Sequence, residues 1–241
     1  GTQEPNAMEI GRYDGGTTFV QTNTPDGEFI STDATDIDGV VFKQYGNRLF
    51  VGAITGALTA RISVYDGIGT TMTATQATLG TFDAVTQNID VTSMKIWNGE
   101  LYIAASKANS AGVYRWLPDP SMTISTVVTN YNLVSNAAGK LNSGDTANID
   151  SVILQNYNGR LYAGSYNATD GTGALYEYDG TKGNWTLINT TRGDFNNNTT
   201  TDGIGMLIEF NGTLYVGVDD GTANKGAVYT WSKTSSNSFN L

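Results

Sequence analysis

Hydrophobic and polar residues alternate over short stretches of this chain, and turns rich in Gly and Asn separate the stretches. In residues 93–106, SMKIW and LYIAA are each of strand length, and Asn98-Gly99 lies between them. Runs rich in β-branched and aromatic residues favour strands. Asn-Gly accepts the positive φ angles that a two-residue hairpin turn requires. The pattern therefore predicts antiparallel hairpins and leaves little room for long helices.

The same hairpin occurs four times along the chain. Each copy has an aromatic residue, a turn with Asn and Gly, one variable residue, Leu followed by Tyr or Phe, and then a small residue. The leucines lie 52, 60 and 53 residues apart, and the copies are YGNRLFVGAI at 45–54, WNGELYIAAS at 97–106, YNGRLYAGSY at 157–166 and FNGTLYVGVD at 210–219. We expect the small residue to let a neighbouring sheet approach closely.

Each hairpin is followed by two more predicted strands. The third strands are ISVYDG at 62–67, GVYRWL at 112–117, ALYEYDG at 174–180 and AVYTWS at 227–232, and fourth strands include ISTVVT at 124–129 and WTLIN at 185–189. A four-stranded unit of this kind cannot bury both faces alone, and copies of it pack radially. The sequence thus predicts an all-β fold, a β-propeller of four-stranded antiparallel blades. A β-sandwich, a β-helix and a helical solenoid each fit the repeat less well.

The repeat predicts one domain over residues 1–241, with four full units and an N-terminal half unit. The half unit copies only third and fourth strands, since Tyr13-Asp14-Gly15 aligns with Tyr65-Asp66-Gly67. The units are 9–32 (half), 33–86, 87–146, 147–201 and 202–241. Two arrangements remain open: a five-bladed ring with an incomplete blade, which we favour, and a four-bladed ring with an N-terminal hairpin packed against it.

Composition excludes several functions. The chain has no Cys and no His, which rules out disulfides, thiolate or imidazole metal sites and a Ser-His-acid relay. Its net charge of −10 argues against nucleic acid and anionic membranes as partners. No apolar run is long enough for a membrane span. Low charge and loops rich in Asn and Thr are typical of secreted or cell-surface prokaryotic proteins, so we expect an extracellular or cell-surface location.

The repeated NGxLYxG and VYxYDG patterns resemble those of bacterial and archaeal surface β-propellers, which are related in pattern to kelch and Asp-box propellers. DGGTTF at 14–19 is similar to the Asp-box core D-x-G-x-T-F, although Arg12 stands where that box has Ser or Thr. The resemblance covers nearly the whole chain and implies the fold alone. Asp-box turns are structural, so they carry no implication of sialidase activity, and fold analogy does not establish function.

One acidic position recurs in every full unit. Asp38, Asp90, Asp150 and Asp202 each precede the first strand, eleven residues before the leucine in three units and twelve in the fourth. First strands line the channel of a propeller, so we expect these carboxylates around one channel mouth. They could form an oxygen-rich cation site, with calcium as the candidate ion, or a carboxylate pair for glycoside chemistry. Repetition favours a structural role instead, in which each Asp caps a turn.

The sequence therefore assigns no catalytic residue and no cofactor beyond that calcium candidate, and it leaves the ligand-binding residues unknown. It favours a non-enzymatic module that is structural, adhesive or ligand-binding, with a protein or glycan partner on a cell surface or in an extracellular assembly. The alternatives are a glycoside hydrolase type of enzyme with paired carboxylates, and a sugar-binding lectin. An enzyme should show non-repeated carboxylates that converge in one deep pocket. Asp219 and Asp220, in the loop after the second strand of the last unit, could add ligands to the cation site or could be solvated loop carboxylates. A lectin should expose equivalent aromatic residues in every unit.

Overall fold

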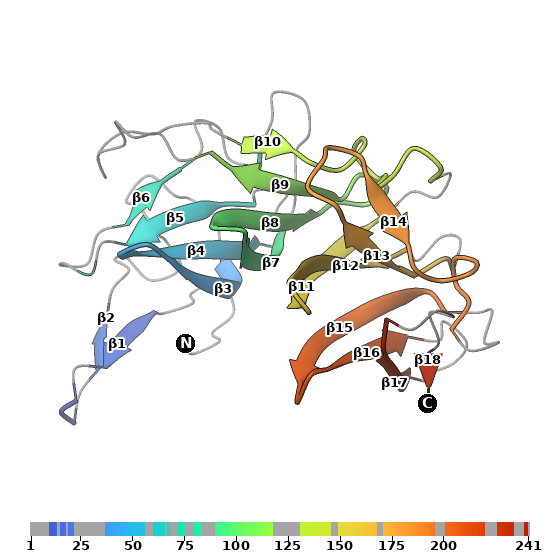
Figure 1. The fold of residues 1–241 in the computed structure, drawn as a ribbon. Coiled ribbons are helices and arrows are strands. Elements are labelled where there is room, and N and C mark those ends of the chain that lie inside the picture. Colours follow the sequence, from blue (N-terminus) through green and yellow to red (C-terminus); the bar gives the residue numbers. More distant parts are fainter. Residues whose placement is uncertain are drawn as a thin grey trace. The chain divides into compact units, whose positions relative to one another are not determined.

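The described part of the chain consists of strands and the turns between them (Figure 1). The computed structural model describes residues 10–13, 15–17, 19–21, 37–55, 60–65, 67, 72–75, 80–82, 90–117, 131–145, 149–167, 171–195, 201–219, 226–233 and 239–240. It contains no helix within these ranges, and accordingly none that is long and apolar enough to cross a membrane. The chain divides into two compact units, residues 1–94 with 116–132 and residues 95–115 with 133–241.

The first unit holds the N-terminal hairpin and the first repeat. β1 (Gly11–Tyr13) pairs only with β2 (Phe19–Gln21) among the described strands, which confirms that residues 9–22 contain two paired strands. The first repeat pairs its strands in sequence order: β3 (Ile37–Tyr45), β4 (Arg48–Thr55), β5 (Ile62–Tyr65) and β6 (Thr73–Ala74). Its core holds Val51, Ala53, Tyr65 and Met72, together with Ile10 from just before β1.

The second repeat has the same strand order, and the border between the units runs through β7, β9 and β10. Its strands are β7 (Asp90–Trp97), β8 (Glu100–Ser106), β9 (Gly112–Trp116) and β10 (Tyr131–Leu133). Residues 124–129, which we expected to form the fourth strand, lie outside the described residues. The described strand in that place is β10.

The second unit contains the third and fourth repeats complete. The third is β11 (Ser151–Tyr157), β12 (Arg160–Tyr166), β13 (Ala174–Tyr178) and β14 (Trp185–Leu187), and the fourth is β15 (Gly203–Phe210), β16 (Thr213–Asp219), β17 (Gly226–Trp231) and β18 (Phe239–Asn240). Each is an antiparallel sheet whose strands pair in sequence order, as the repeat predicted.

The Asn-Gly turns have the backbone that the sequence predicted. Asn98, Asn158 and Asn211 have φ of 50°, 47° and 50°, and the glycines that follow them have φ of 77°, 73° and 73°. A two-residue turn with two positive φ angles matches the twist of the strands it joins. These turns therefore fix the register of the first two strands in each of these repeats.

The small residue of the second strand admits the first strand of the next repeat. A Cβ on Gly52 would lie 2.5 Å from Val91 Cγ1, and a Cβ on Gly164 would lie 2.6 Å from Ile204 Cγ2. Both distances are far below a van der Waals contact. The expectation of close approach is confirmed at these two positions.

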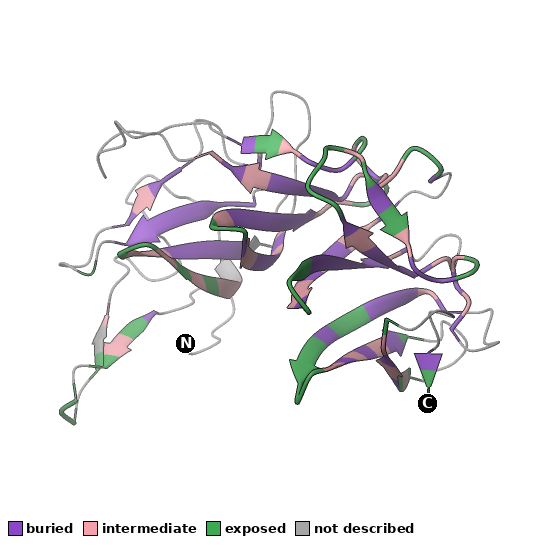
Figure 2. Cartoon of the chain, in the orientation of Figure 1, coloured by how far each residue is buried: buried purple, intermediate pink, exposed green. Residues whose placement is uncertain are grey.

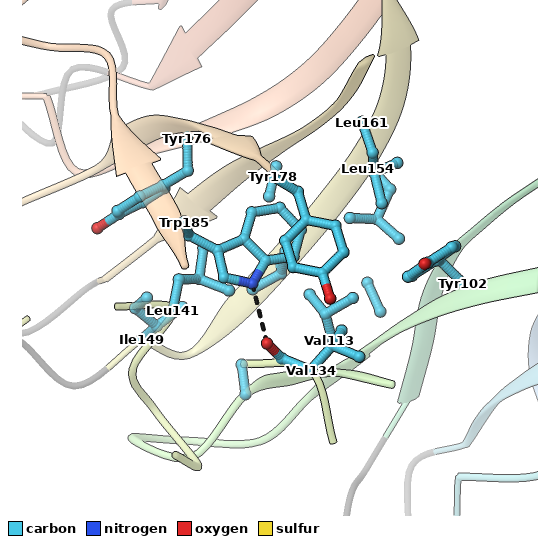
Figure 3. Packing of buried hydrophobic residues seen from close by; sticks show 14 of the residues in the cluster. Tyr102, Val113, Val134, Leu141, Ile149, Leu154, Leu161, Tyr176, Tyr178 and Trp185 are labelled. Atoms are coloured by element: carbon cyan, nitrogen blue, oxygen red, sulfur yellow. Dashed lines mark hydrogen bonds between the residues drawn. The ribbon is translucent and has the colours of Figure 1, made fainter. Parts of the chain in front are cut away.

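The core of the second unit lies between successive sheets (Figure 2). Figure 3 shows one cluster, in which Trp185 stacks on Tyr178 at 4.4 Å between ring centroids and its indole N–H donates to the Val134 carbonyl at 3.2 Å. The repeated leucines Leu101, Leu161 and Leu214 are fully buried. Leu49 of the first repeat is only partly buried.

A cross-strand ion pair occurs in the second and third repeats with its charges exchanged. In the second repeat Glu100 on β8 pairs with Arg115 on β9, and the nitrogen–oxygen distance is 3.3 Å. In the third repeat Arg160 and Glu177 occupy the corresponding strands, with a nitrogen–oxygen distance of 3.8 Å. The two repeats share the same geometry with opposite polarity.

Candidate functional site

Strand pairing in the second unit brings the ends of four strands into one row. Ser151 of β11 pairs with Tyr166 of β12, Tyr166 pairs with Gly203 of β15, and Gly203 pairs with Asp219 of β16. Two of the four predicted aspartates directly precede members of this row, at positions 150 and 202. The row therefore collects three acidic residues at one edge of the unit.

Backbone hydrogen bonds place these aspartates on either side of the end of β12. The Asp150 N–H donates to the Tyr166 carbonyl at 2.9 Å, and the Asn167 N–H donates to the Asp202 carbonyl at 2.9 Å. The Asp202 N–H in turn donates to the Asp219 carbonyl at 2.9 Å. Asp150 and Asp202 therefore flank the end of β12 on its two sides.

The carboxylates of Asp150 and Asp202 each lie against a loop of the preceding repeat. Asp150 Oδ1 accepts a hydrogen bond from the backbone N–H of Asn109, which has φ 57°, at 2.6 Å. Asp202 Oδ1 lies 2.9 Å from the position that a Cβ on Gly171 would take, and Gly171 has φ 58° in the corresponding loop. Asp150 thus caps a turn, and this turn belongs to the repeat before its own.

Tyr166 lies at the centre of the row. Its side chain covers Gly203 so closely that a Cβ on Gly203 would lie 2.7 Å from Tyr166 Cγ. Burial raises the pKa of the Tyr166 phenol. The carboxylates that raise this pKa further belong to Asp202, Asp219 and Asp150, in that order. All three acidic groups therefore act on one hydroxyl, which remains a hydrogen-bond donor at neutral pH.

Two members of this site break the repeat. Five residues after the repeated leucine, the four repeats carry Ile54, Ser106, Tyr166 and Asp219. Neither the phenol nor the extra carboxylate is a repeated feature. Asp219 is exposed at the end of β16, as a group available to a ligand would be. The sequence offered Asp219 only as a possible extra ligand of a cation site, and the row that joins it to Tyr166 depends on strand pairing between repeats.

The other two predicted aspartates lie in the first unit. Asp90 begins β7, where it pairs with Ile54 of β4. The backbone of Asp38 lies in β3, and its side chain is outside the described residues, as is Asp220. The meeting of all four repeated aspartates at one channel mouth stays a prediction. In the part of the chain that the structure describes, no three acidic residues are grouped so that they could hold a metal ion.

A buried acidic residue that the sequence reasoning missed lies between the second and third repeats. Asp145 accepts hydrogen bonds from the backbone N–H groups of Leu141 and Asn142, at 2.7 and 3.0 Å, and from the Tyr176 hydroxyl at 3.0 Å. It also pairs with Arg192. Each of its contacts comes from the protein itself, so the cluster holds loops together.

Exposed aromatic residues do not follow the repeat. The large aromatic side chains exposed in the described ranges are Tyr13, Phe19, Phe42 and Phe210. They occupy four different positions of the repeat, on β1, β2, β3 and β15. One sugar-stacking residue per blade, which a lectin of the expected kind needs, is therefore not among them.

No protein-family model matches this chain, and no curated protein sequence matches it. Solved structures do match. A β-xylosidase/α-arabinofuranosidase of glycoside hydrolase family 43 from a compost microbial metagenome has a TM-score of 0.51 at 12% identity, covering 92% of this chain and 78% of that chain. An α-L-arabinofuranosidase from Clostridium thermocellum has a TM-score of 0.50 at 11% identity, covering 93% and 78%. A further β-xylosidase has a TM-score of 0.51 at 12% identity, covering 92% and 79%.

These comparisons confirm the predicted fold: the chain is a β-propeller. They also correct the expected function. The sequence favoured a non-enzymatic structural, adhesive or ligand-binding module, whereas the solved structures that share this fold are glycosidases. That expectation was wrong because repetition of the four aspartates was taken to mean that no site breaks the symmetry. The row at Tyr166 contains both repeated and non-repeated groups.

Proposed function

We propose that this protein is a carbohydrate-active enzyme of the glycoside hydrolase type, with Asp150 and Asp202 as its carboxylate pair. The observation that carries the proposal is Asp219, a non-repeated carboxylate that strand pairing brings into the same row of strand ends as the pair. The likeness to glycosidase structures supports the same class of chemistry. Its substrate is a glycan outside the cell or on a cell surface, and xylosides and arabinofuranosides are the first to test.

Two carboxyl groups suffice for glycoside hydrolysis. One protonates the leaving oxygen, and the other activates a water or attacks the sugar. Carboxyl groups about 6.5–9.5 Å apart leave room for a water and invert the anomeric centre, whereas about 5–5.5 Å leads to retention. The anomeric configuration of the first product therefore tells the two mechanisms apart.

Tyr166 has a positioning role in this scheme. The Asp202, Asp219 and Asp150 carboxylates lie near enough to raise the pKa of this phenol, which stays protonated at neutral pH and can donate a hydrogen bond to a carboxylate or to the substrate. The ring is itself held in place by the backbone of Gly203.

A metal ion does not fit this set of residues. One of the similar structures is described as a calcium-free form. Calcium takes six to eight oxygen ligands, and one oxygen of Asp150 already accepts an amide hydrogen bond. No group of three acidic side chains in the described ranges could hold an ion. No step of the proposed reaction runs through a metal.

The test is turnover of 4-nitrophenyl β-xyloside and α-arabinofuranoside, with the anomer of the first product followed by proton NMR. Asp150→Asn and Asp202→Asn should each lower kcat by about 10²–10⁴-fold, the usual contribution of a general acid or base. Asn keeps an oxygen that can accept from Asn109, so the fold should survive. The matched control is Asp179→Asn, since Asp179 caps an outer turn through Thr181 N–H at 2.7 Å.

The control variant should keep full activity. Absence of turnover on a broad panel of glycosides would refute the proposal. Equal activity of the Asp150→Asn and Asp179→Asn variants would refute the assignment of the pair.

A further inference from the structure

The loop between the second and third strands of the second repeat, residues 107–111, is bonded to the aspartate of the next repeat. The Lys107 N–H donates to the Asp150 carbonyl at 3.1 Å, and the Ala111 N–H donates to the Ile149 carbonyl at 2.9 Å. Within the loop, the Ser110 N–H donates to the Lys107 carbonyl at 2.9 Å, which closes a turn. Both ends of this turn are therefore fixed to the backbone that carries the Asp150 side chain.

The corresponding loop of the third repeat, residues 167–173, is bonded to Asp202 in the same way. Of this loop, residues 168–170 lie outside the described ranges. The Asn167 N–H donates to the Asp202 carbonyl at 2.9 Å, and the Gly173 N–H donates to the Thr201 carbonyl at 3.0 Å. A Cβ on Gly173 would lie 2.4 Å from Gly203 Cα, so the two backbones are in direct contact. Two successive aspartates of the row are thus held by a loop of the preceding repeat.

A glycine of the linker between repeats supports each loop on its other side. The Gly139 N–H donates to the Ala111 carbonyl at 2.9 Å, and its carbonyl accepts from the Ile149 N–H at 3.0 Å. Gly193 makes the two corresponding bonds in the third repeat, at 2.8 and 3.2 Å. A Cβ on Gly139 would lie 2.4 Å from the Asn109 carbonyl oxygen. The loop is therefore enclosed between the linker and the aspartate.

Each loop has one left-handed residue beside the carboxylate of its aspartate. Asn109 has φ 57°, and its N–H donates to Asp150 Oδ1 at 2.6 Å. Gly171 has φ 58°, and a Cβ on it would lie 2.9 Å from Asp202 Oδ1. A hydrogen bond from an amide to a carboxylate is shorter and roughly twice as strong as one between neutral groups. The bond from Asn109 therefore fixes the rotation of the Asp150 carboxylate.

We propose that Asn109 and Gly171 are positioning residues for the carboxylate pair, an inference that rests on the proposed function. Each acts through its aspartate, Asn109 on Asp150 and Gly171 on Asp202. Because the positioning residue belongs to the preceding repeat, the packing of two successive repeats determines how each carboxylate is oriented. A displacement of about 1 Å at a reacting group can lower a rate about 10²-fold.

Both positions need a residue that accepts a positive φ angle. Gly adopts this conformation freely, and Asn adopts it more readily than most residues. A β-branched residue with positive φ is an outlier, so Val at position 109 should turn the amide away from Asp150. An Ala at position 171 would place its Cβ against the end of the Asp202 side chain. The Asp202 carboxylate, as the movable part, should then rotate away.

NMR of the full chain tests the contact at Asn109 without any substrate. The Asn109 amide proton should resonate downfield, because its hydrogen bond to a carboxylate is short. Asp150→Ala should shift this resonance upfield and speed the exchange of the proton with solvent. Asp179→Ala, at an outer turn, should leave it unchanged. An Asn109 resonance that does not respond to Asp150→Ala would overturn the inference.

Turnover of the 4-nitrophenyl glycosides tests the effect on Asp150. Asn109→Val should lower kcat about 10–100-fold and leave KM almost unchanged, because the carboxylate is misplaced while the substrate contacts stay. Asn109→Gly, which keeps the amide and accepts the φ angle, should restore the kcat that Val removes. The matched control is Asn98→Val, since Asn98 has φ 50° in the turn at the other end of β7 and β8. It should lower the melting temperature similarly without lowering kcat.

Gly171→Ala tests the effect on Asp202 with a second matched control. It should lower kcat about tenfold or more, because the new Cβ displaces a carboxylate. Gly99→Ala introduces the same kind of backbone strain, at φ 77°, but its Cβ would have no neighbour within 4 Å. Gly99→Ala should therefore keep the wild-type kcat. Equal kcat of these two variants would show that Gly171 does not position Asp202.

The kinetic results also separate this inference from the proposed function. Suppose that the wild-type chain hydrolyses a glycoside and Asp150→Asn does not. Equal kcat of Asn109→Val and Asn98→Val would then overturn the positioning role alone. If the wild-type chain hydrolyses no glycoside, the proposed function is wrong and the positioning role is wrong with it, even where NMR shows the contact.

Discussion

Replacing Gly164 by Ala tests whether the close approach of successive repeats determines stability. The new Cβ would lie 2.6 Å from Ile204 Cγ2 and 2.8 Å from Ile204 Cβ. Both are atoms of a β-branched side chain next to its backbone, so neither can move without the strand. Overpacking of this kind costs about 1–3 kcal/mol. Ala also has less conformational freedom than Gly in the unfolded chain, and this effect stabilises the folded protein by about 0.4–1 kcal/mol.

The net loss should therefore be at most about 2.6 kcal/mol, which corresponds to a fall of up to about 10 °C in the melting temperature at this chain length. Gly217→Ala is the matched control, because Gly217 occupies the same position of the fourth repeat. Its Cβ would lie 3.3 Å from Met206 Cβ and 3.5 Å from the mobile Met206 Cε. This variant should be neutral or slightly stabilised.

Urea unfolding followed by circular dichroism measures both variants. Truncating the Ile204 side chain should also relieve the clash in the Gly164→Ala variant. Gly164→Ala combined with Ile204→Ala should therefore show a favourable coupling energy in a double-mutant cycle. If Gly164→Ala is as stable as Gly217→Ala, the repeats do not approach each other as described, and the reasoning fails.

Two further predictions concern contacts between repeats. Tyr157→Phe removes the hydrogen bond to the Gly212 carbonyl and should cost about 0.5–1.5 kcal/mol in urea unfolding; an unchanged midpoint would show that the aromatic contact alone joins the repeats. Burial by itself would raise the pKa of Glu177, but hydrogen bonds from Lys233 and Tyr162 outweigh it and lower this pKa below the ordinary 4.5. Because the folded-state pKa is depressed, the stability that Glu177 contributes is present above pH 4.5 and is lost as the pH falls below it. Glu177→Gln should make the free energy of unfolding less dependent on pH below 4.5. If the pH dependence in this range is unchanged, the pKa of Glu177 is not lowered by folding.

Local chemistry explains why the sequence predicted the architecture. Asn98-Gly99 and Asn158-Gly159 determine a turn from two adjacent residues, and the period of the leucines then places the strands around it. The predicted fourth strand of the second repeat, ISTVVT at 124–129, lies outside the described residues and stays a prediction. The described strand that pairs with β9 is β10 at Tyr131–Leu133.

The candidate site could not be predicted to the same extent, because its contacts cross between repeats. Asp150 was expected to cap a turn of its own, but its partner Asn109 lies 41 residues earlier. The link between Tyr166 and Asp219 depends on one pairing between β12 and β15. Periodicity shows which positions are equivalent. It does not show which non-equivalent side chains meet at the end of a row.

The exchanged ion pairs of the second and third repeats have a consequence for folding. Repeat proteins are prone to misassembly, since an inner hairpin can associate with the outer strands of the wrong copy. If the hairpin of the second repeat joined β13, Glu100 would face Glu177, and the converse error would place Arg160 against Arg115. Like charges opposite each other on paired strands are destabilising. The opposite charge order of the ion pairs in these two repeats therefore destabilises a hairpin that pairs with the third strand of the wrong repeat. This disfavours misassembly during folding.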